Sequence, residues 1–387
     1  MVKAIKVMLI PNNVQKTKMF QYAGASRFAY NWALAREKEN YEKGGRFISD
    51  SELRKEFTKL RHSDEYAWLL SISNNVTKQA IKDACIAYKN FFRGLQKFPR
   101  FKSRKRSMPK FYQDNVKIQF SNTHVKFEGF SSSRKANKQK MNWVRLAEHG
   151  RIPIDANYMN PRISFDGLNW WISVCVEFPD CRETLNDDGV GIDLGMKDFA
   201  VCSDAVKYKN INKSQKVKKL EKQKRRLQRS ISRSYEKNKK GESYCKTNNV
   251  IKKEKLLLKR NHRLTNIRKN YLNQTVSEIV NRKPRFICIE DLNVSGMMKN
   301  RHLSKAVQEQ GFFWFRKQLE YRCSDKGIQL IVADRFYPSS KLCSCCGNIK
   351  KDLKLSDRVY RCECGNMIDR DFQASINLKA YGERFAS

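Results

Sequence analysis

The sequence lacks any apolar run of about 18 residues, the length that a helix needs to cross a bilayer. Its first residues, Met1-Val2-Lys3-Ala4-Ile5-Lys6, also lack the hydrophobic run of a signal peptide. Acidic residues are scarce, with 39 Asp and Glu against 79 Lys and Arg, and the formal net charge is +40. We therefore expect a cytoplasmic protein with no membrane partner. A compact chain with this surplus repels itself, so we expect a polyanion as its partner.

General disorder is also excluded. The chain has 387 residues, 40% of them hydrophobic, and includes 22 Phe and 15 Tyr. This is enough apolar material for more than one folded core.

The cysteines indicate metal binding rather than disulfides. Five of the twelve lie between positions 343 and 364, whereas seven are scattered: Cys85, Cys175, Cys181, Cys202, Cys245, Cys288 and Cys323. In a reducing compartment, such a cluster is typical of a structural zinc site with four thiolate ligands. We predict that Zn²⁺ binds Cys343, Cys346, Cys362 and Cys364, with Cys345 outside the site. The Cys362-Glu363-Cys364 pair is one residue tighter than the usual two-residue spacer.

Hydrophobic periodicity predicts an α+β protein of several parts. A short strand is expected over Ala4–Ile10, and helical spacing then runs from Lys16 to Phe92. Alternating patterns follow and favour an antiparallel sheet or small barrel, interrupted early by the helical bundle; they cover residues 116–120, 124–127, 144–146 and 170–178. A polar linker over 180–189 precedes a further unit that begins at Val190.

Two basic segments are candidates for nucleic-acid contact. In Phe98–Arg106, basic and aromatic residues alternate beside a proline, which suits phosphate contact or base stacking but equally a solvated connector. Residues 207–269 hold 24 Lys and Arg against four acids, with apolar residues at helical intervals. We expect two helices joined near Lys240-Gly241 and lying along nucleic acid, rather than a disordered charged tract. The candidate contacts are Arg100, Lys102, Arg104, Lys105, Lys222, Arg225, Arg226 and Arg229.

Three acids far apart in the sequence predict a metal-dependent nuclease. Asp193 and Glu290 each end a buried-strand pattern, and Asp371 lies at the start of a later helix. Carboxylates at the ends of adjacent strands can converge in space. Three such acids can bind two divalent cations about 4 Å apart, which activate water and stabilise the leaving oxygen of a phosphodiester. Mg²⁺ suits these hard oxygen ligands. Asp198, Asp291 and Asp369 compete for the same roles, although the last two could instead cap helices or pair with Arg370.

These residues together resemble TnpB, the transposon-encoded family related to type V CRISPR nucleases. The matching segments span nearly the whole chain: Ala29-Tyr30-Asn31-Trp32, Phe98-Pro99-Arg100-Phe101-Lys102, Gly191-Ile192-Asp193-Leu194-Gly195, Ile289-Glu290-Asp291-Leu292-Asn293-Val294, Tyr337-Pro338-Ser339-Ser340-Lys341, the cysteine cluster and Asp369-Arg370-Asp371. One departure is Gln373, which stands where the family usually carries Asn and keeps an amide on a longer side chain.

The resemblance implies an RNA-guided DNA endonuclease of the prokaryotic cytoplasm, acting at the nucleoid. It would bind a guide RNA from the transposon end and cut target double-stranded DNA next to a short flanking motif. The implied catalytic acids are Asp193, Glu290 and Asp371, with Mg²⁺. The implied parts are a wedge β-barrel (1–15 and 95–180), a helical recognition lobe (16–94), a linker (181–189), a RuvC-like RNase H domain (190–340 and 366–387) with a basic helical hairpin (207–270), and a zinc-binding insertion (341–365).

Other functions stay open at this point. Relatives of this family can lose the nuclease and act as RNA-guided transcriptional regulators, although all three acids are present here. A compact CRISPR effector is a further alternative, but the short chain favours the transposon form. A guide-independent resolvase or transposase would need neither the helical lobe nor this much charge. The sequence leaves the oligomeric state open.

Overall fold

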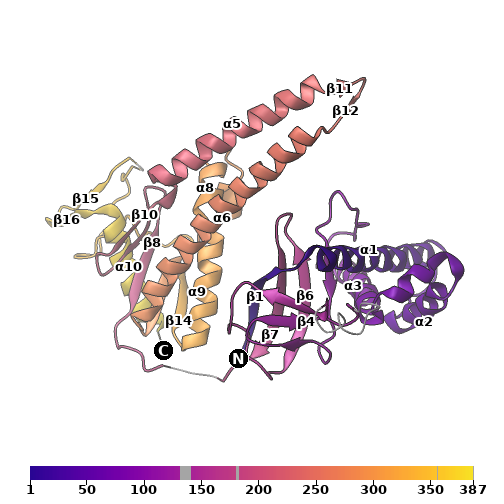
Figure 1. Ribbon diagram of the computed structural model, residues 1–387. Helices are drawn as coiled ribbons and strands as arrows, with labels where there is room; N and C mark the ends of the chain where they lie inside the picture. Colours follow the sequence, from indigo (N-terminus) through magenta and orange to yellow (C-terminus); the bar gives the residue numbers. More distant parts are fainter. Residues whose placement is uncertain (131–140, 180–182, 355, 387) are drawn as a thin grey trace. The chain divides into compact units, whose positions relative to one another are not determined.

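The chain divides into two compact units, Met1–Pro179 and Asp180–Ser387 (Figure 1). The computed structural model describes residues 1–130, 141–179, 183–354 and 356–386. Each unit combines helices with its own sheet, which confirms the predicted α+β class. In the described ranges, no helix combines the length and apolar character required to span a bilayer. The first three residues of the polar linker predicted over 180–189, which include Cys181, lie outside those ranges.

A seven-stranded antiparallel sheet forms the base of the first unit. Its order is β2-β6-β7-β1-β5-β4-β3. The longest pairing joins β1 to β7, from Val2 opposite Glu177 to Leu9 opposite Trp170. Alternate residues of β7 are buried, as its sequence pattern predicts. The strands are β1 (Val2–Ile10), β2 (Lys110–Tyr112), β3 (Gln119–Phe120), β4 (His124–Lys126), β5 (Trp143–Leu146), β6 (Tyr158–Phe165) and β7 (Trp170–Glu177).

Three α-helices and one 3₁₀ helix lie between β1 and β2 in the sequence. They are α1 (Asn13–Glu42), α2 (Asp50–Arg61), the 3₁₀ helix η1 (Asp64–Ser71) and α3 (Asn74–Phe92). Capping boxes start two of them, with Asn12 and Gln15 at α1 and Ser49 and Glu52 at α2. Phe57 of α2 and Tyr88 of α3 are buried in the core, whereas Phe20 of α1 is 44% exposed and Phe92 of α3 is 52% exposed.

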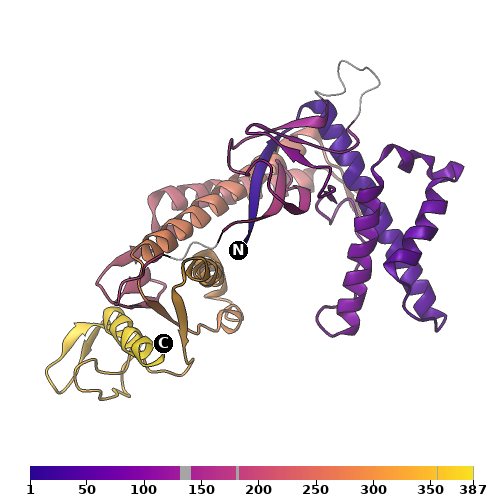
Figure 2. The ribbon, with the colours of Figure 1, turned by 90° about the horizontal axis from the view of Figure 1, so that it is seen from below.

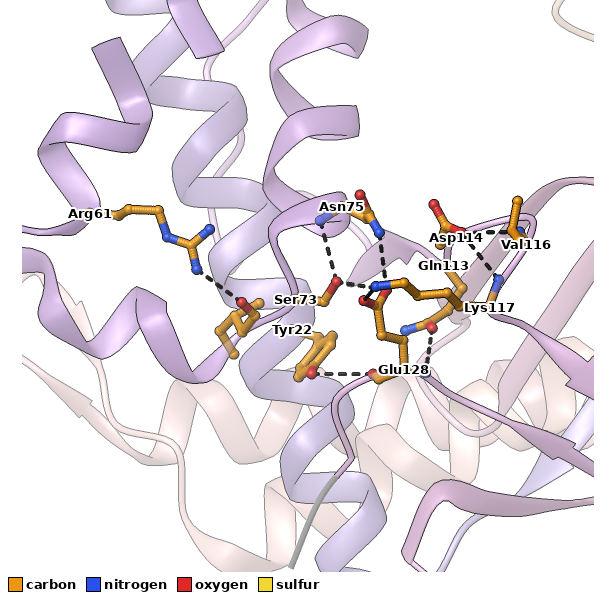
Figure 3. Close-up of polar contacts among 10 residues, drawn as sticks. Tyr22, Arg61, Ser73, Asn75, Gln113, Asp114, Val116, Lys117 and Glu128 are labelled. Carbon is orange, nitrogen blue, oxygen red and sulfur yellow. Dashed lines mark hydrogen bonds and ion pairs between the residues drawn. The ribbon is translucent and has the colours of Figure 1, made fainter. Parts of the chain in front are cut away.

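Glu128 ties the helices of this unit to its sheet, and Figure 3 shows it at the centre of a polar cluster. Its carboxylate accepts hydrogen bonds from the Ser73 hydroxyl (2.9 Å), the Asn75 amide (3.2 Å) and the Lys117 ammonium group (2.6 Å). Ser73 is the N-cap of α3, so one partly buried carboxylate joins the start of that helix to the segment that follows β4.

The expected strand over 116–120 is correct only for its last two residues. Asp114 accepts hydrogen bonds from the amides of Val116 (3.0 Å) and Lys117 (3.2 Å), as Figure 3 also shows. This side chain closes a turn, because an Asp carboxylate can bind backbone amides two and three residues on. The prediction of a strand at 116–118 was therefore wrong, and β3 begins at Gln119.

A five-stranded mixed sheet forms the centre of the second unit, in the order β10-β9-β8-β13-β14. Its first three strands are antiparallel, whereas β13 runs parallel to both β8 and β14. The strands are β8 (Val190–Leu194), β9 (Asp198–Cys202), β10 (Lys207–Lys209), β13 (Phe286–Glu290) and β14 (Gln329–Ala333).

Helices cover both faces of this sheet. On one face, the β13 residues Ile287 and Ile289 pack with residues of α6 (Asn248–Asn281) and α9 (Phe312–Lys326). On the other, Phe286 and Cys288 pack with Leu378 of α10 (Arg370–Phe385). Figure 1 shows α10 on one side of the sheet and α6 and α9 on the other. The smaller elements are η2 (Ile211–Lys213), α7 (Val294–Met297), α8 (Ser304–Gln310), β15 (Val359–Arg361) and β16 (Met367–Asp369).

The basic tract folds into two long helices. Helix α5 (Gln215–Lys237) and the first half of α6 lie side by side and extend away from the sheet, with strands β11 (Lys239–Lys240) and β12 (Ser243–Tyr244) at the tip (Figures 1 and 2). The second helix runs to Asn281, beyond the basic tract, because its last turns are apolar and pack on the sheet.

The described part of the expected linker is bound to this unit. Glu183 pairs with Lys326 (2.7 Å) and Lys283 (3.2 Å), and Asp188 pairs with Lys379 (2.6 Å). These ion pairs fasten the chain to α9, α10 and the end of α6, so a polar composition here does not mean a free connector.

Candidate functional site

Two of the three predicted acids lie side by side at the carboxyl ends of parallel strands. Ile289 of β13 is paired with Ile192 of β8, so the next residues, Glu290 and Asp193, are neighbours. Ile192 and Ile289 point toward α6 and α9, and side chains alternate along a strand. Asp193 and Glu290 therefore point to the opposite face, which α10 covers.

A glycine lets α10 approach this face closely. A Cβ atom on Gly191 would lie 2.1 Å from the carbonyl oxygen of Ser375 and 2.3 Å from the amide nitrogen of Lys379. Both are backbone atoms of α10 and cannot move aside as a side chain could. The close approach brings the first turn of α10, which carries Asp371, to the end of β8.

Burial and mutual repulsion act on these carboxylates. Desolvation raises the pKa of Asp193 well above its usual value, and the charges of Glu290 and Asp371 raise it further. Burial also raises the pKa of Glu290, and a hydrogen bond from the Ser339 hydroxyl partly offsets this. A divalent cation would relieve the repulsion, and carboxylate oxygens suit Mg²⁺. The charges of Glu290 and Asp371 both act on Asp193. Among the described residues, only the four cysteines discussed below bring three or more possible ligand atoms close enough together to hold a metal ion.

Two of the three competing acids, Asp369 and Asp291, have structural partners. Asp369 caps α10 by accepting hydrogen bonds from the amides of Asp371 (3.1 Å) and Phe372 (3.0 Å). Asp291 pairs with Arg316 (2.9 Å) and with Arg335, and the two guanidinium groups lower the pKa of its carboxyl. Arg370 pairs with Asp371, with 3.3 Å between its Nη2 and the carboxylate Oδ1. Asp198 begins β9, on the strand next to Asp193.

The four predicted cysteine ligands come together in one cluster. The sulfur atoms of Cys343, Cys346, Cys362 and Cys364 all lie within 4.8 Å of one another. Cys343 Sγ is 3.6 Å from Cys364 Sγ, and Cys346 Sγ is 3.6 Å from Cys362 Sγ. Cys345 is exposed and outside the group. The short spacer between the last pair therefore does not prevent convergence. Four thiolates suit a structural Zn²⁺ site that leaves no position open for water.

One member of the cluster favours the thiolate form. Burial raises the pKa of the Cys343 thiol, but hydrogen bonds from the Cys346 amide and the Asn366 side chain outweigh burial and bring this pKa to about 6. The thiolate is the form that binds metal.

Gln373 faces the cysteine loop. Its side-chain amide nitrogen donates to the carbonyl oxygen of Leu342 (2.6 Å), and its Oε1 accepts from the hydroxyl of Ser344 (2.9 Å). The side chain is fully buried. Within the described residues, its hydrogen bonds join it to the loop around Cys343 and not to the three acids.

Of the four nucleic-acid contacts predicted in the Phe98–Arg106 segment, three are exposed and one packs against the protein. Arg100, Arg104 and Lys105 are exposed. Lys102 instead lies over the ring of Tyr30, with its ammonium nitrogen 3.0 Å from the ring centroid. Asn31 holds the Lys102 backbone with two hydrogen bonds of 2.8 Å. Burial lowers the pKa of Lys102 to about 7, and the charge of Lys110 adds to this.

Arg104, Lys105 and Arg106 of this loop border a hollow of about 860 Å³ beside α1, whereas Arg100 does not line it. Arg27, Phe20 and Met108 also line it. Arg27 could not be predicted from the sequence, because a single arginine on a long helix carries no signal, whereas Arg106 lies within the basic segment Phe98–Arg106.

All four predicted contacts on α5 line one exposed hollow of about 540 Å³. They follow helical spacing, at 222, 225, 226 and 229, and therefore share one face of the helix. Lys218 and Lys305 extend this basic surface. Two acids at its base, Glu221 and Glu309, both pair with Arg268 at 3.2 and 3.3 Å, so the hollow stays strongly basic.

Three family models match the chain. They are described as "Helix-turn-helix domain" (residues 1–46), "Probable transposase" of the OrfB/IS605 type (residues 173–301) and "Cas12f1-like, TNB domain" (residues 312–378). Residues 1–46 here form strand β1 and the single long helix α1 instead of two helices joined by a turn. The matches define a transposon-associated protein with a Cas12f-like carboxy-terminal region. Over these residues the chain resembles the OrfB/IS605 family, which is also called TnpB.

Similar proteins match along almost the whole chain. The "Putative RNA-guided DNA endonuclease InsQ" of Escherichia coli (strain K12) is 29% identical over 400 residues, covering 98% of this chain and 92% of that protein. A protein of the same general description from Streptomyces pristinaespiralis is 28% identical and covers 98% and 89%. Among solved structures, a Cas12f1–sgRNA–target DNA complex has a similar fold, with a TM-score of 0.62, 12% identity and 98% of both chains covered.

Proposed function

We propose that this protein is an RNA-guided DNA endonuclease of the TnpB type, in which Asp193, Glu290 and Asp371 hold Mg²⁺ for phosphodiester hydrolysis. The observation that carries the proposal is the position of Asp193 beside Glu290 at the ends of parallel strands, with Asp371 near enough for its charge to act on Asp193. A buried carboxyl whose pKa is raised by neighbouring acids is a candidate for a functional site. The relatives from Escherichia coli and Streptomyces pristinaespiralis, which are described as RNA-guided DNA endonucleases, support the proposed activity.

Each part of the chain has a role in the proposed nuclease. We assign a RuvC-like RNase H core to the five-stranded sheet, because three antiparallel strands are followed by two parallel ones with acids at the ends of β8 and β13. The first unit would serve as the wedge domain, with α1–α3 as its recognition lobe. The four cysteines would hold one structural Zn²⁺.

Each part would contribute to guided cleavage. Base pairing between guide RNA and target strand would supply most of the specificity, while the protein grips the backbones and reads a short flanking motif. The exposed arginines and lysines beside α1 and on α5 would bind phosphates. When bound, Mg²⁺ would neutralise negative charge on the scissile phosphate and lower the pKa of the attacking water. The carboxylates would orient the ions at the scissile phosphate.

Guided cleavage of a plasmid library with randomised flanks tests the proposal. The protein is copurified with RNA from its native locus and supplied with Mg²⁺. We expect cutting that depends on the RNA, on the flank and on the three acids. Asp193→Asn should lower cleavage by a factor of about 10³ or more, as loss of a catalytic electrostatic group does, and should retain RNA and target binding. Asp198→Asn is the matched control, since it removes an acid from the neighbouring strand.

The alternative outcomes are distinct. Guided binding without cutting by the wild-type protein would indicate a regulator. Cutting without RNA would contradict the guided mechanism. Loss of RNA binding in Asp193→Asn would show that this acid maintains the fold rather than the reaction.

A further inference from the structure

A chain of hydrogen bonds leads from the cysteine cluster toward the acidic site. The Asn366 side-chain nitrogen lies 3.4 Å from Cys343 Sγ and 3.3 Å from Gln373 Oε1. The amide nitrogen of Gln373 in turn donates to the Leu342 carbonyl at 2.6 Å. This carbonyl belongs to the peptide bond that joins Leu342 to Cys343. Helix α10 thus holds the backbone of a zinc-ligand candidate through Gln373.

A second side chain of α10 extends the path. Asn377, one turn after Gln373, donates to the carbonyls of Leu342 (2.7 Å) and Ser339 (2.7 Å). The Leu342 carbonyl accepts two hydrogen bonds and so uses both of its lone pairs. Gln373, Asn377 and Ser339 are each at most 4% exposed. Buried polar networks whose members are satisfied hold their side chains rigidly.

The path ends at one of the three acids. The hydroxyl of Ser339 donates a hydrogen bond to Oε1 of Glu290. One carboxylate oxygen of Glu290 is thereby engaged, which fixes the rotation of the group and leaves Oε2 for a cation. Hydrogen-bond partners of this kind orient metal-binding carboxylates, and their loss typically weakens metal binding by about 10–100-fold.

We propose that Ser339 is a positioning residue for Glu290, and that Gln373 and Asn377 hold it in register with the cysteine cluster. The cluster then does more than stabilise a local fold: its geometry sets the orientation of a carboxylate at the cleavage site. This inference rests on the proposed metal-binding role of Glu290. The sequence alone predicted no role for Ser339 or for the side-chain amides of Gln373 and Asn377 on α10.

Binding of Mn²⁺, used as a stand-in for Mg²⁺, tests the proposal in the full-length zinc-loaded protein. Calorimetry should show a site that Asp371→Asn abolishes. We expect Ser339→Ala to weaken this site at least about tenfold, with zinc content and melting temperature unchanged. Ser340→Ala is the matched control, because Ser340 is the adjacent serine and its hydroxyl forms no hydrogen bond within the described residues. It should bind Mn²⁺ as the wild type does.

A double-mutant cycle tests the link to the cysteines. Gln373→Met keeps the length of the side chain but loses its hydrogen bonds. If Gln373 acts through Ser339, the double variant should bind Mn²⁺ little more weakly than Ser339→Ala alone. Additive losses would overturn this link, and wild-type affinity in Ser339→Ala would overturn the positioning role. Absence of any Asp371-dependent Mn²⁺ site in the wild type would overturn the proposed metal site as well. Guided cleavage, measured separately, decides the proposed function.

Discussion

At the scale of single residues, the acidic site is electrostatically unfavourable without a cation. The raised pKa of Asp193 comes first from burial and then from Glu290 and Asp371. A carboxyl whose pKa is higher in the folded than in the unfolded state destabilises the fold once it is ionised. The penalty is present above the folded pKa and disappears below the unfolded one.

Removing this charge should therefore stabilise the metal-free protein. We expect Asp193→Asn, at neutral pH with chelator, to raise the melting temperature of the second unit by roughly 2–4 °C, the shift that 1 kcal/mol gives at this size. Added Mg²⁺ should stabilise the wild type and not the variant. Calorimetry with and without Mg²⁺ measures both, and Asp198→Asn serves as control. A lower melting temperature for the variant in chelator would contradict the electrostatic argument.

Sequence alone could predict the acids and cysteines because their chemistry shows in single motifs. Asp193 and Glu290 end apolar runs, and four cysteines stand within 22 positions. The role of Ser339 could not be predicted in this way. Its partner Glu290 is 49 positions away, and serine in a loop is ordinary. Lys102 was predicted to contact nucleic acid, but packing against Tyr30 turns it inward.

At the scale of elements, one carboxylate holds the helical part of the first unit to its sheet. Burial alone would raise the pKa of Glu128, but hydrogen bonds from Lys117, Ser73 and Asn75 outweigh it and lower this pKa. A carboxyl with a lowered folded pKa stabilises the protein above its unfolded pKa. The stabilisation is lost as the pH falls through the folded value.

Glu128→Gln should therefore cost stability at neutral pH and cost progressively less in acid. We expect a loss of about 1 kcal/mol at pH 7, and the difference from wild type should shrink as the pH falls below about 4.3, the ordinary value for Glu. Urea unfolding followed by tryptophan fluorescence reports on this unit, because it contains five of the six tryptophans. Glu148→Gln, which breaks only the exposed pair with Arg151, is the control. A loss independent of pH would exclude the charged form as its cause.

The hydrophobic periodicity of the sequence predicted the strands in which every second residue is buried. It did not predict the elements whose pattern is interrupted or whose shape depends on a single side-chain hydrogen bond. Strand β7 alternates without interruption and was predicted in full. Strand β6 was missed, because Asn160 and Pro161 interrupt its pattern and its register shifts between Met159 and Arg162. The turn at Asp114 depends on one side chain and overrode an alternating sequence. Local side-chain hydrogen bonds of this kind compete with strand formation without changing the hydrophobic pattern.

At the scale of the whole molecule, the dominant property is the net charge of +40, half of which comes from residues 207–269. The structure gives this charge a definite form. Lys222, Arg225, Arg226 and Arg229 share a basic hollow on α5, while Lys252, Lys255, Lys259 and Arg263 form an exposed stripe on α6. The two sets carry the same charge and lie on neighbouring helices. Comparing a variant that lacks the α5 set with one that lacks the α6 set therefore distinguishes phosphate binding in the hollow from general electrostatic attraction of RNA.

The salt dependence of RNA binding shows whether the hollow on α5 binds phosphates or only adds to the general attraction of RNA. Removing one cation that neutralises a phosphate should reduce the slope of log K against log salt by roughly 0.7–0.9. If the hollow on α5 binds phosphates, replacing its four residues with Gln should therefore lower the slope by roughly 3, and the same change on α6 should lower it much less. Filter binding from low to high salt measures both. Equal slopes for the two variants would mean that the hairpin attracts RNA as a diffuse cationic arm, and that its hollow does not bind phosphates specifically.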